Sequence, residues 1–249
     1  MDFGRQIAHN AAMIDPVRIN KYLAERGLAS RREADVLIAA GQVLVNGKPA
    51  TLGQKVTLKD TIEIVGVQKE KKYVAYYKAR GIITHSPAAH ETDIETKLKS
   101  DYGLTGLHPV GRLDKDSEGL IILSNDGLIT GPLLDSESKH EKEYVVTVDK
   151  EVNAPFLKKM SLGVTIEGYT TKPAKAELKK DTDKKQFILT ITEGKKHQIR
   201  RMCAALGYQV QSLKRIRIIN IELHGLKPNQ YRTIAGKELQ IFLNELNVK

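Results

Sequence analysis

A charged segment followed at once by an apolar run most constrains what this chain can fold into. The segment carries two carboxylates, Asp114 and Asp116, with the basic residues Arg112 and Lys115 interleaved. Residues 120–123 are all leucine or isoleucine, a run whose length and branching are typical of a buried strand. The pattern predicts a charged loop on the end of a rigid strand, a common way to hold a reactive side chain in place. A solvated turn is the alternative interpretation of the charges alone.

The charge balance favours a polyanionic partner. The 249 residues carry a formal net charge of +10, and the pI is near 9.5. This favours nucleic acid over an anionic membrane, although a merely soluble basic protein could have the same charge. There is no long apolar run and no N-terminal signal pattern. We therefore expect a cytoplasmic protein that does not span a membrane.

The chain lacks the residue patterns that disulfides, common metal sites and nucleotide cofactors require. Cys203 is the one cysteine, which excludes an internal disulfide and any multi-cysteine metal site. The seven histidines show no metal-ligand spacing, and neither a P-loop nor a dinucleotide-binding glycine motif is present. We therefore expect neither a metal nor a nucleotide cofactor.

The first part of the chain is predicted to form a compact module over residues 17–66. An apolar face around Leu23 predicts a short helix, and the capping-box sequence Ser30-Arg31-Arg32-Glu33 predicts the start of a second helix. Asn46-Gly47 is a strong hairpin signal, and the apolar residues on both sides of Asp60 predict one more pair of short strands.

Two adjacent arginines, Arg31 and Arg32, stand at the start of the second predicted helix. Cations in the first turn of a helix are repelled by the helix dipole, and each such cation costs roughly a few tenths of a kcal/mol. Their position is understandable if they face phosphates, although simple solvation of the two side chains is the alternative.

The rest of the chain is predicted to contain both strands and helices. The helix predicted over residues 199–206 places four apolar side chains on one face, so Cys203 is interpreted as a core residue and not as a nucleophile. From Thr190 to Asn220 there are seven Lys or Arg residues and one acid, Glu193, which predicts a continuous basic surface. Further strands are predicted at 73–77, 145–148, 177–178, 186–192 and 214–221, and further helices at 94–98 and 239–246.

Three motifs resemble those of the pseudouridine synthases. Residues 111–120, Gly-Arg-Leu-Asp-Lys-Asp-Ser-Glu-Gly-Leu, resemble the signature of the branch that acts on ribosomal RNA. Lys142-x-Tyr144 resembles the second family motif, and residues 194–202, Gly-Lys-Lys-His-Gln-Ile-Arg-Arg-Met, resemble the third. One departure is Lys78-Ala79, where the family usually has Lys-Pro. Residues 17–66 resemble the small RNA-binding domain named after ribosomal protein S4.

The resemblance implies an α+β fold of two domains. A mobile tail at residues 1–16 precedes the S4-like RNA-binding domain at 17–66, and a charged linker at 67–73 leads to the catalytic domain at 74–249. The catalytic domain should be built on a mixed, largely antiparallel sheet.

The resemblance also implies the roles of individual residues. Asp114 would be the catalytic carboxylate, Tyr144 would pack against the target base, and Arg200 would pair with Asp114. If Asp114 is buried, its charge requires such a fixed cation. The residues expected to contact RNA are Arg112, Arg18, Lys21, Arg31, Arg32, Lys142, Lys195, Lys196, His197 and Arg201.

The implied activity is the isomerisation of a uridine to pseudouridine without a cofactor. The expected substrate is large-subunit (23S) ribosomal RNA, with small-subunit RNA and tRNA as alternatives, and we expect a monomer without an obligate protein partner. Whether Asp114 attacks or deprotonates is left open by the sequence. Two other functions also remain: a non-catalytic RNA-binding or ribosome-assembly factor, and a glycosidase-like enzyme that uses the two carboxylates.

Overall fold

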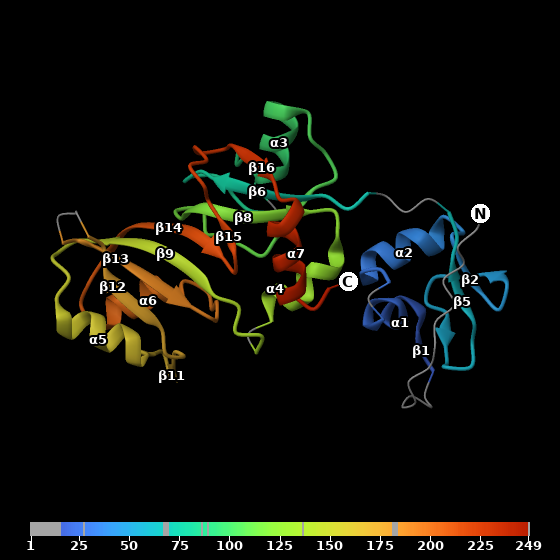
Figure 1. The fold of residues 1–249 in the computed structure, drawn as a ribbon, viewed down its shortest axis with the longest axis horizontal. Helices are drawn as coiled ribbons and strands as arrows, with labels where there is room; N and C mark the ends of the chain where they lie inside the picture. Colours follow the sequence, from blue (N-terminus) through green and yellow to red (C-terminus); the bar gives the residue numbers. More distant parts are fainter. Residues whose placement is uncertain are drawn as a thin grey trace. The chain divides into compact units, whose positions relative to one another are not determined.

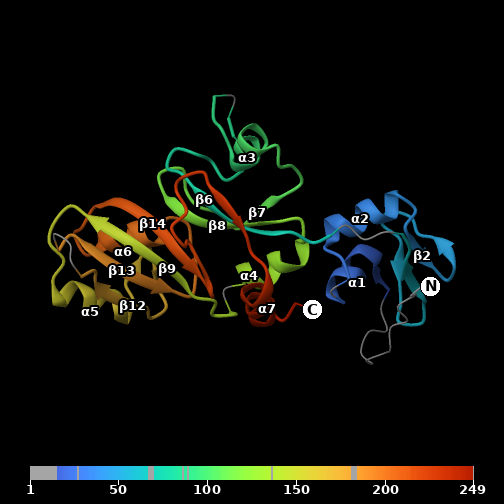
Figure 2. The ribbon, with the colours of Figure 1, turned by 45° about the horizontal axis from the view of Figure 1, so that its top comes forward.

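The computed structural model describes residues 16–248 except 27, 67–69, 86, 89, 136 and 181–183. The predicted tail up to residue 15 and the linker residues 67–69 lie outside the described residues. The chain divides into two compact units. The first comprises the described residues within 16–71, 126–131 and 248, and the second comprises those within 72–125 and 132–247. Figures 1 and 2 show the elements of each unit.

The N-terminal unit packs two helices against short strands. Its core contains Ile19 and Leu23 from the first helix, Ala34 from the second, and Val43 from a strand, all fully buried. The Ser30–Glu33 capping box is formed, as predicted: the Ser30 hydroxyl accepts from Glu33 N, and the Glu33 carboxylate accepts from Ser30 N. The elements are β1 (Val17–Arg18), α1 (Ile19–Glu25), α2 (Arg31–Ala39), β2 (Val43–Val45), β3 (Lys48–Pro49), β4 (Lys55–Val56) and β5 (Ile62–Ile64).

The predicted pairing of the two strands around Asp60 is wrong. Strand β4 pairs with β1, whereas β5 pairs with β2. The Asp60 carboxylate accepts hydrogen bonds from Thr57 N at 2.7 Å and from Asn46 Nδ2 at 2.8 Å. The side chain thus closes a turn and joins it to the Asn46-Gly47 hairpin, so β5 lies beside β2. The hairpin itself is confirmed, because β2 and β3 pair across it.

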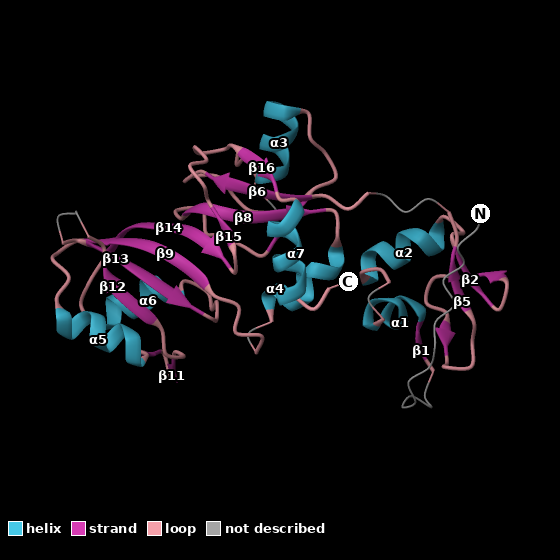
Figure 3. Ribbon diagram, in the orientation of Figure 1, coloured by secondary structure: helices cyan, strands magenta, loops and turns pink. Residues whose placement is uncertain are grey.

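The second unit is built on one nine-stranded sheet, shown in magenta in Figure 3. Its main order is β12-β13-β9-β14-β8-β6-β16, with β15 beside β14 and β7 beside β8. Among the described strands of this sheet, β14 and β8 pair in parallel and the other pairs are antiparallel. The expected α+β fold with a mixed, largely antiparallel sheet is confirmed.

The strand bounds agree with most of the predicted strands. The strand β16 was not predicted. The sheet strands are β6 (Tyr73–Lys78), β7 (His108–Val110), β8 (Glu118–Ser124), β9 (Lys142–Val148), β12 (Lys175–Leu178), β13 (Gln186–Ile191), β14 (Val210–Ile218), β15 (Ile221–Glu222) and β16 (Tyr231–Thr233). A separate hairpin, β10 (Thr165–Ile166) and β11 (Tyr169–Thr170), was also not predicted.

Helices α5 and α6 cover one face of the sheet beneath β9 and β13 (Figure 3). Phe156 from α5 and Met202 from α6 pack with Phe187 of β13 in one apolar core. Cys203 lies in the same core, and burial raises the pKa of its thiol to about 12, so its interpretation as a core residue is confirmed. The helical elements are α3 (Ile94–Tyr102), the 3-10 helix η1 (Gly127–Ile129), α4 (Thr130–Leu134), α5 (Ala154–Leu162), α6 (Gln198–Ala205) and α7 (Gly236–Glu245).

The parallel contact between β8 and β14 depends on Gly119. The residue has φ +108°, and a Cβ atom there would lie 2.2 Å from the backbone oxygen of Arg215. Gly119 and Arg215 are register partners. Because only glycine lets two backbones approach this closely, Gly119 allows β14 to lie beside the strand that carries the charged loop.

We predict that Gly119→Ala destabilises the protein, because the added methyl group must displace the β14 backbone. A loss of about 2–4 kcal/mol in the free energy of unfolding is expected from strain of this kind. Gly131→Ala is the matched control, since nothing lies within 4 Å of a Cβ atom there. Urea denaturation of both variants tests this, and equal stabilities would contradict the close approach.

Candidate active site

One cavity of about 970 Å³ in the second unit brings together seven of the predicted site residues, whereas Arg200 and Arg201 do not line it. Asp114 comes from the loop between β7 and β8, Tyr144 from β9, and His197 from the turn before α6. Tyr144 is 7% exposed, so its ring forms part of the cavity boundary and of the core beneath it. The predicted residues that line the cavity are Arg112, Asp114, Lys142, Tyr144, Lys195, Lys196 and His197.

A buried threonine holds the backbone next to Asp114. The Thr84 hydroxyl donates to Leu113 O at 2.7 Å and accepts from Leu113 N at 3.1 Å. On the other side, Ser117 N donates to Asp114 O at 3.0 Å and closes a turn. The backbone before and after Asp114 is therefore hydrogen-bonded, which limits where its carboxylate can lie.

Lys78 lies beneath the same loop and is fully buried. Its ammonium group donates to Ile82 O at 2.7 Å and Ala79 O at 3.1 Å, and it lies 3.5 Å from Lys115 O. Burial lowers the pKa of Lys78 to about 8, although the charges of the nearby Asp114 and Asp116 carboxylates raise it. Gly81 N also donates to Lys115 O, so this segment stays attached to the loop although Ala79 replaces the usual proline.

The expected contact between Arg200 and the Asp114 carboxylate is not formed in the described structure. Arg200 instead donates to Asp116 O at 3.2 Å and to the Ser117 hydroxyl at 3.4 Å. It also donates to Val210 O. The guanidinium thus joins α6 to the charged loop through neutral acceptors two and three residues beyond Asp114.

Asp114 is also only partly buried, whereas the need for a paired cation assumed a buried carboxylate. Its side chain is 41% exposed, so water can solvate the charge without a paired arginine. The nearest ionisable partner is His197, whose Nε2 lies 3.5 Å from Asp114 Oδ1. His197 has a left-handed backbone at φ 53°, directly before the first residue of α6. This placement directs its ring toward Asp114.

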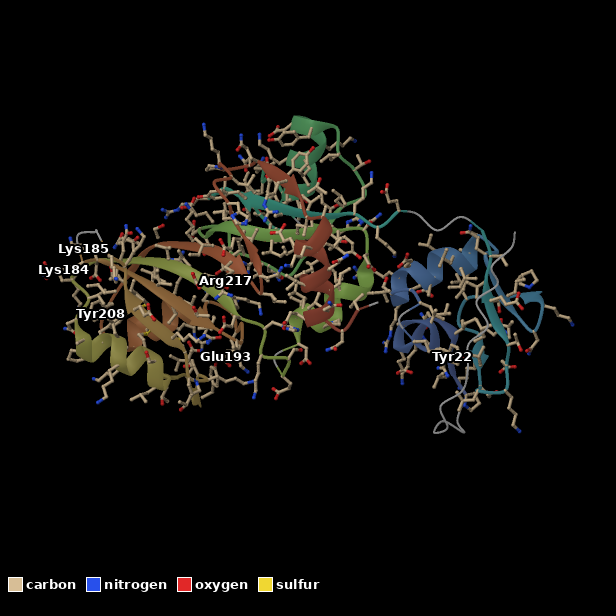
Figure 4. All side chains as sticks on the ribbon, in the orientation of Figure 1. Tyr22, Lys184, Lys185, Glu193, Tyr208 and Arg217 are labelled. Atoms are coloured by element: carbon tan, nitrogen blue, oxygen red, sulfur yellow. The ribbon has the colours of Figure 1, made fainter. Side chains whose placement is uncertain are left out.

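The predicted continuous basic surface is wrong as a description of residues 190–220. Arg217 is paired with Glu141 at 2.9 Å and Glu143 at 2.8 Å, and Arg201 is paired with Glu167. Figure 4 labels Arg217 and Glu193. Lys195 and Lys196, which also belong to this stretch, line the cavity and are exposed.

Glu193 has a structural role. Its buried Oε1 atom accepts from Gln198 Nε2 at 2.7 Å, Lys172 N at 2.9 Å and the Tyr169 hydroxyl at 3.0 Å. The carboxylate therefore joins the β10–β11 hairpin to the start of α6. Burial, followed by the hydrogen bond to Glu193, raises the pKa of Tyr169 to about 12.

Four predicted RNA-contact residues belong to the N-terminal unit. Arg18, Arg31 and Arg32 are exposed, with Arg31 and Arg32 in the first turn of α2. Lys21 forms an ion pair with Glu25 at 3.5 Å. The contact of these four residues with RNA stays a prediction.

Arg215 and Tyr169 are among the cavity residues that were not predicted as site residues. Arg215 lies on β14 and is 5% exposed. A strand with basic residues at alternate positions, such as Lys-Arg-Ile-Arg, suggests an exposed edge, so the sequence carried no sign of this burial.

Residues 72–205 match the family model described as RNA pseudouridylate synthase. The chain belongs to the RNA pseudouridylate synthase family. Residues 17–62 match the S4 domain model. The chain is therefore an RNA pseudouridine synthase, an isomerase.

Curated relatives of this RNA pseudouridine synthase match along most of the chain. The dual-specificity RNA pseudouridine synthase RluF of Escherichia coli K12 is 39% identical over 229 residues, which are 90% of this chain and 77% of that protein. Ribosomal large subunit pseudouridine synthase B of Bacillus subtilis is 38% identical over 233 residues, 90% of this chain and 94% of that protein.

A solved structure supports the same assignment. A crystal structure of a pseudouridylate synthase has a TM-score of 0.66 to this chain at 29% identity, covering 92% of this chain and 99% of that one. Within the part of the synthase that the structure describes, no helix has the length and apolar composition required to cross a membrane.

We predict that Thr84→Val lowers both stability and activity. The variant leaves Leu113 N and O unpaired in a buried place, which should cost about 1–3 kcal/mol of unfolding free energy. The loop that carries Asp114 would also be less well positioned. Thr84→Ser retains the hydroxyl and is the control. Urea denaturation and pseudouridine formation measure the two effects, and a serine variant as impaired as valine would contradict the role of the hydroxyl.

Lys142 gives a pH-dependent prediction. Burial, followed by the charge of Arg215, lowers the pKa of Lys142 from 10.5 to about 8. Between these values the unfolded chain binds the Lys142 proton more strongly, so the unfolding free energy contributed by this group rises with pH. Below about pH 8, burial of the cation opposes folding in full.

Lys142→Met should therefore stabilise the protein more at pH 7 than at pH 10. Urea denaturation at both pH values measures the difference. The exposed strand residue Lys48 provides the control variant Lys48→Met, whose effect on stability should be nearly the same at the two values. An effect of Lys142→Met that does not change with pH would contradict the burial of this ammonium group.

Proposed function

We propose that this enzyme isomerises a uridine in large-subunit (23S) ribosomal RNA, with Asp114 as the nucleophile and without a cofactor. The main observation in support of this proposal is that Asp114 and Tyr144 line one cavity. The cations Arg112, Lys195 and Lys196 line the same cavity. A carboxylate, an aromatic ring and exposed cations suit a flipped base and its neighbouring phosphates.

The geometry gives each group a role. Tyr144 offers a ring against which the uracil can pack, as aromatic side chains do with bases that leave the helix. The Asp114 side chain is 41% exposed and would lose water when the base fills the cavity. Its carboxylate then acts on the ribose or the base of the target nucleotide.

The reaction needs only groups that the chain supplies. The bond between uracil N1 and ribose C1′ breaks, the uracil rotates, and a bond forms between C5 and C1′. The C5 proton is lost and N1 gains a proton, so the change is an isomerisation that needs no oxidant or reductant. Arg112 is exposed beside Asp114 and can take the place of the flipped base or bind a phosphate.

The names of the relatives support the substrate class. The Bacillus subtilis relative is named for the large ribosomal subunit, and the Escherichia coli relative is named for dual specificity. We assign 23S ribosomal RNA as the main substrate and tRNA as the second candidate. Arg31 and Arg32 of the N-terminal unit would bind RNA phosphates, because both are exposed at a helix start.

The proposal includes a monomeric enzyme that acts in the cytoplasm without an obligate protein partner. The domain assignment, with an RNA-binding domain at residues 17–66 and a catalytic domain at 74–249, is part of the same proposal.

A second candidate is a non-catalytic RNA-binding factor on the same scaffold. The observation in its favour is that Arg200 contacts the loop backbone and not the Asp114 carboxylate. The turnover of an Asp114 variant separates the two functions.

We predict that Asp114→Asn abolishes turnover and leaves RNA affinity nearly unchanged, because an amide cannot act as the nucleophile while the shape of the loop is kept. The measurement is tritium release from RNA labelled at uridine C5, with ribosomal RNA and tRNA from an enzyme-deficient strain assayed separately.

Asp116→Asn is the matched control and should retain turnover, since Asp116 contacts Arg200 through its backbone oxygen. Tritium release by Asp114→Asn at the wild-type rate would refute the nucleophile role. No release by the wild type, with tight RNA binding, would favour the binding factor.

A further inference from the structure

Arg215 is a buried cation with a donor that the protein does not use. The side chain is 5% exposed and lines the cavity. Its Nε donates to Leu120 O at 2.7 Å, and its Nη1 lies 3.4 Å from Arg112 O. Its Nη2 is buried and has no hydrogen-bond partner. Within the described residues no carboxylate forms an ion pair with this guanidinium.

The position of Arg215 is next to the groups that would hold the target base. Arg215 and Tyr144 are register partners on β14 and β9, so both side chains leave the same face of the sheet. The Nη1 contact to Arg112 O joins the guanidinium to the loop two residues before Asp114. The unused donor therefore belongs to a side chain that lies between the tyrosine and the carboxylate-bearing loop.

A second cation, Lys142, lines the same cavity. Its ammonium group has one long contact, 3.5 Å to His140 O. Lys142 lies two residues before Tyr144 on β9, so its side chain leaves the same face of the sheet as Tyr144 and its register partner Arg215. Arg215 is buried and Lys142 is half-buried, and cations with unfilled hydrogen-bonding capacity in such places oppose folding unless a ligand compensates them.

We propose that Arg215 and Lys142 bind the carbonyl oxygens of the target uracil and stabilise the negative charge that develops on it when the glycosidic bond breaks. This inference rests on the proposed function. It adds a substrate contact at Arg215 and changes the role of Lys142 from RNA-backbone binding to base binding.

The chemistry requires such groups whichever way Asp114 acts. When the N1–C1′ bond breaks, its electron pair remains with the uracil and spreads onto the ring oxygens. Donors fixed in advance where charge develops are among the strongest contributions to catalysis. The charge disappears when C5 bonds to C1′, the C5 proton leaves to water and N1 takes up a proton, so all atoms and electrons are accounted for.

A backbone phosphate is a less suitable ligand for Arg215. Phosphates remain at the surface of RNA, where the exposed cations Arg112, Lys195 and Lys196 can reach them. Arg215 is almost fully buried, at a depth that a flipped base reaches more easily than a backbone does.

The test compares Arg215→Gln and Lys142→Gln with the wild type on two RNAs, one with uridine and one with 5-fluorouridine at the target position. Conversion in a single turnover is measured after RNA digestion as loss of the N1-linked target nucleoside, and RNA affinity is measured by filter binding. On fluorouridine RNA, C5 has no proton to lose, so the C5-linked product takes up water at C6 instead. Fluorine withdraws electrons, so the departing fluorouracil anion needs less stabilisation. Lys214→Gln is the matched control, because this substitution removes the same charge from the neighbouring position on β14. The Lys214 side chain stacks over Tyr77.

On uridine RNA we expect Arg215→Gln to be slower by about 100-fold. Lys142→Gln should also be slower than the wild type, and Lys214→Gln should react at the wild-type rate. All three variants should bind RNA with nearly wild-type affinity. The loss for Arg215→Gln should be clearly smaller on fluorouridine RNA.

Equal losses on both RNAs, or no loss, would overturn the inference and leave the proposed function intact. If Arg215→Gln does not fold, the same comparison with Lys142→Gln decides the question. If the wild type converts neither RNA, the proposed function itself fails.

Discussion

The parallel contact between β8 and β14 is the constraint on which the active site depends. Gly119 lets the β14 backbone pass where any larger residue would collide with Arg215 O. The same contact places the Arg215 side chain beneath the loop of Asp114, where it donates to Leu120 O. If position 119 carried a side chain, β14 would lie farther from β8. The loop of Asp114 would then lie farther from the Arg215 guanidinium and from Tyr144 on β9.

The loop itself is held by hydrogen bonds to its backbone and to the Ser117 hydroxyl, and no arginine pairs with the Asp114 carboxylate among the described residues. Thr84, Lys78 and Arg200 all bind the loop backbone or the Ser117 hydroxyl. The carboxylate of Asp114 therefore remains available to a substrate, with His197 at 3.5 Å as its neighbour. A bidentate partner would instead stabilise the carboxylate in the resting enzyme and reduce its reactivity.

Local patterns predicted local structure well. The Ser30–Glu33 capping box, the Asn46-Gly47 hairpin and the apolar face of α6 all formed where residues close in sequence make the contacts. The predictions that failed concern partners far apart in the chain. Whether a short strand pairs with its neighbour or with a distant strand, and which acceptor a long arginine reaches, depends on packing that sequence spacing does not contain.

The sequence by itself determined the family, the α+β class, and the loop that carries Asp114, because motif order and apolar periodicity are local properties of the chain. The tertiary structure alone decided the contacts of that loop. It buried Arg215, paired Arg217 with Glu141 and Glu143, and left Asp114 partly exposed. The physical reason is that burial and ion pairing depend on which strands become neighbours, and here a glycine on one strand decides how closely the next can approach.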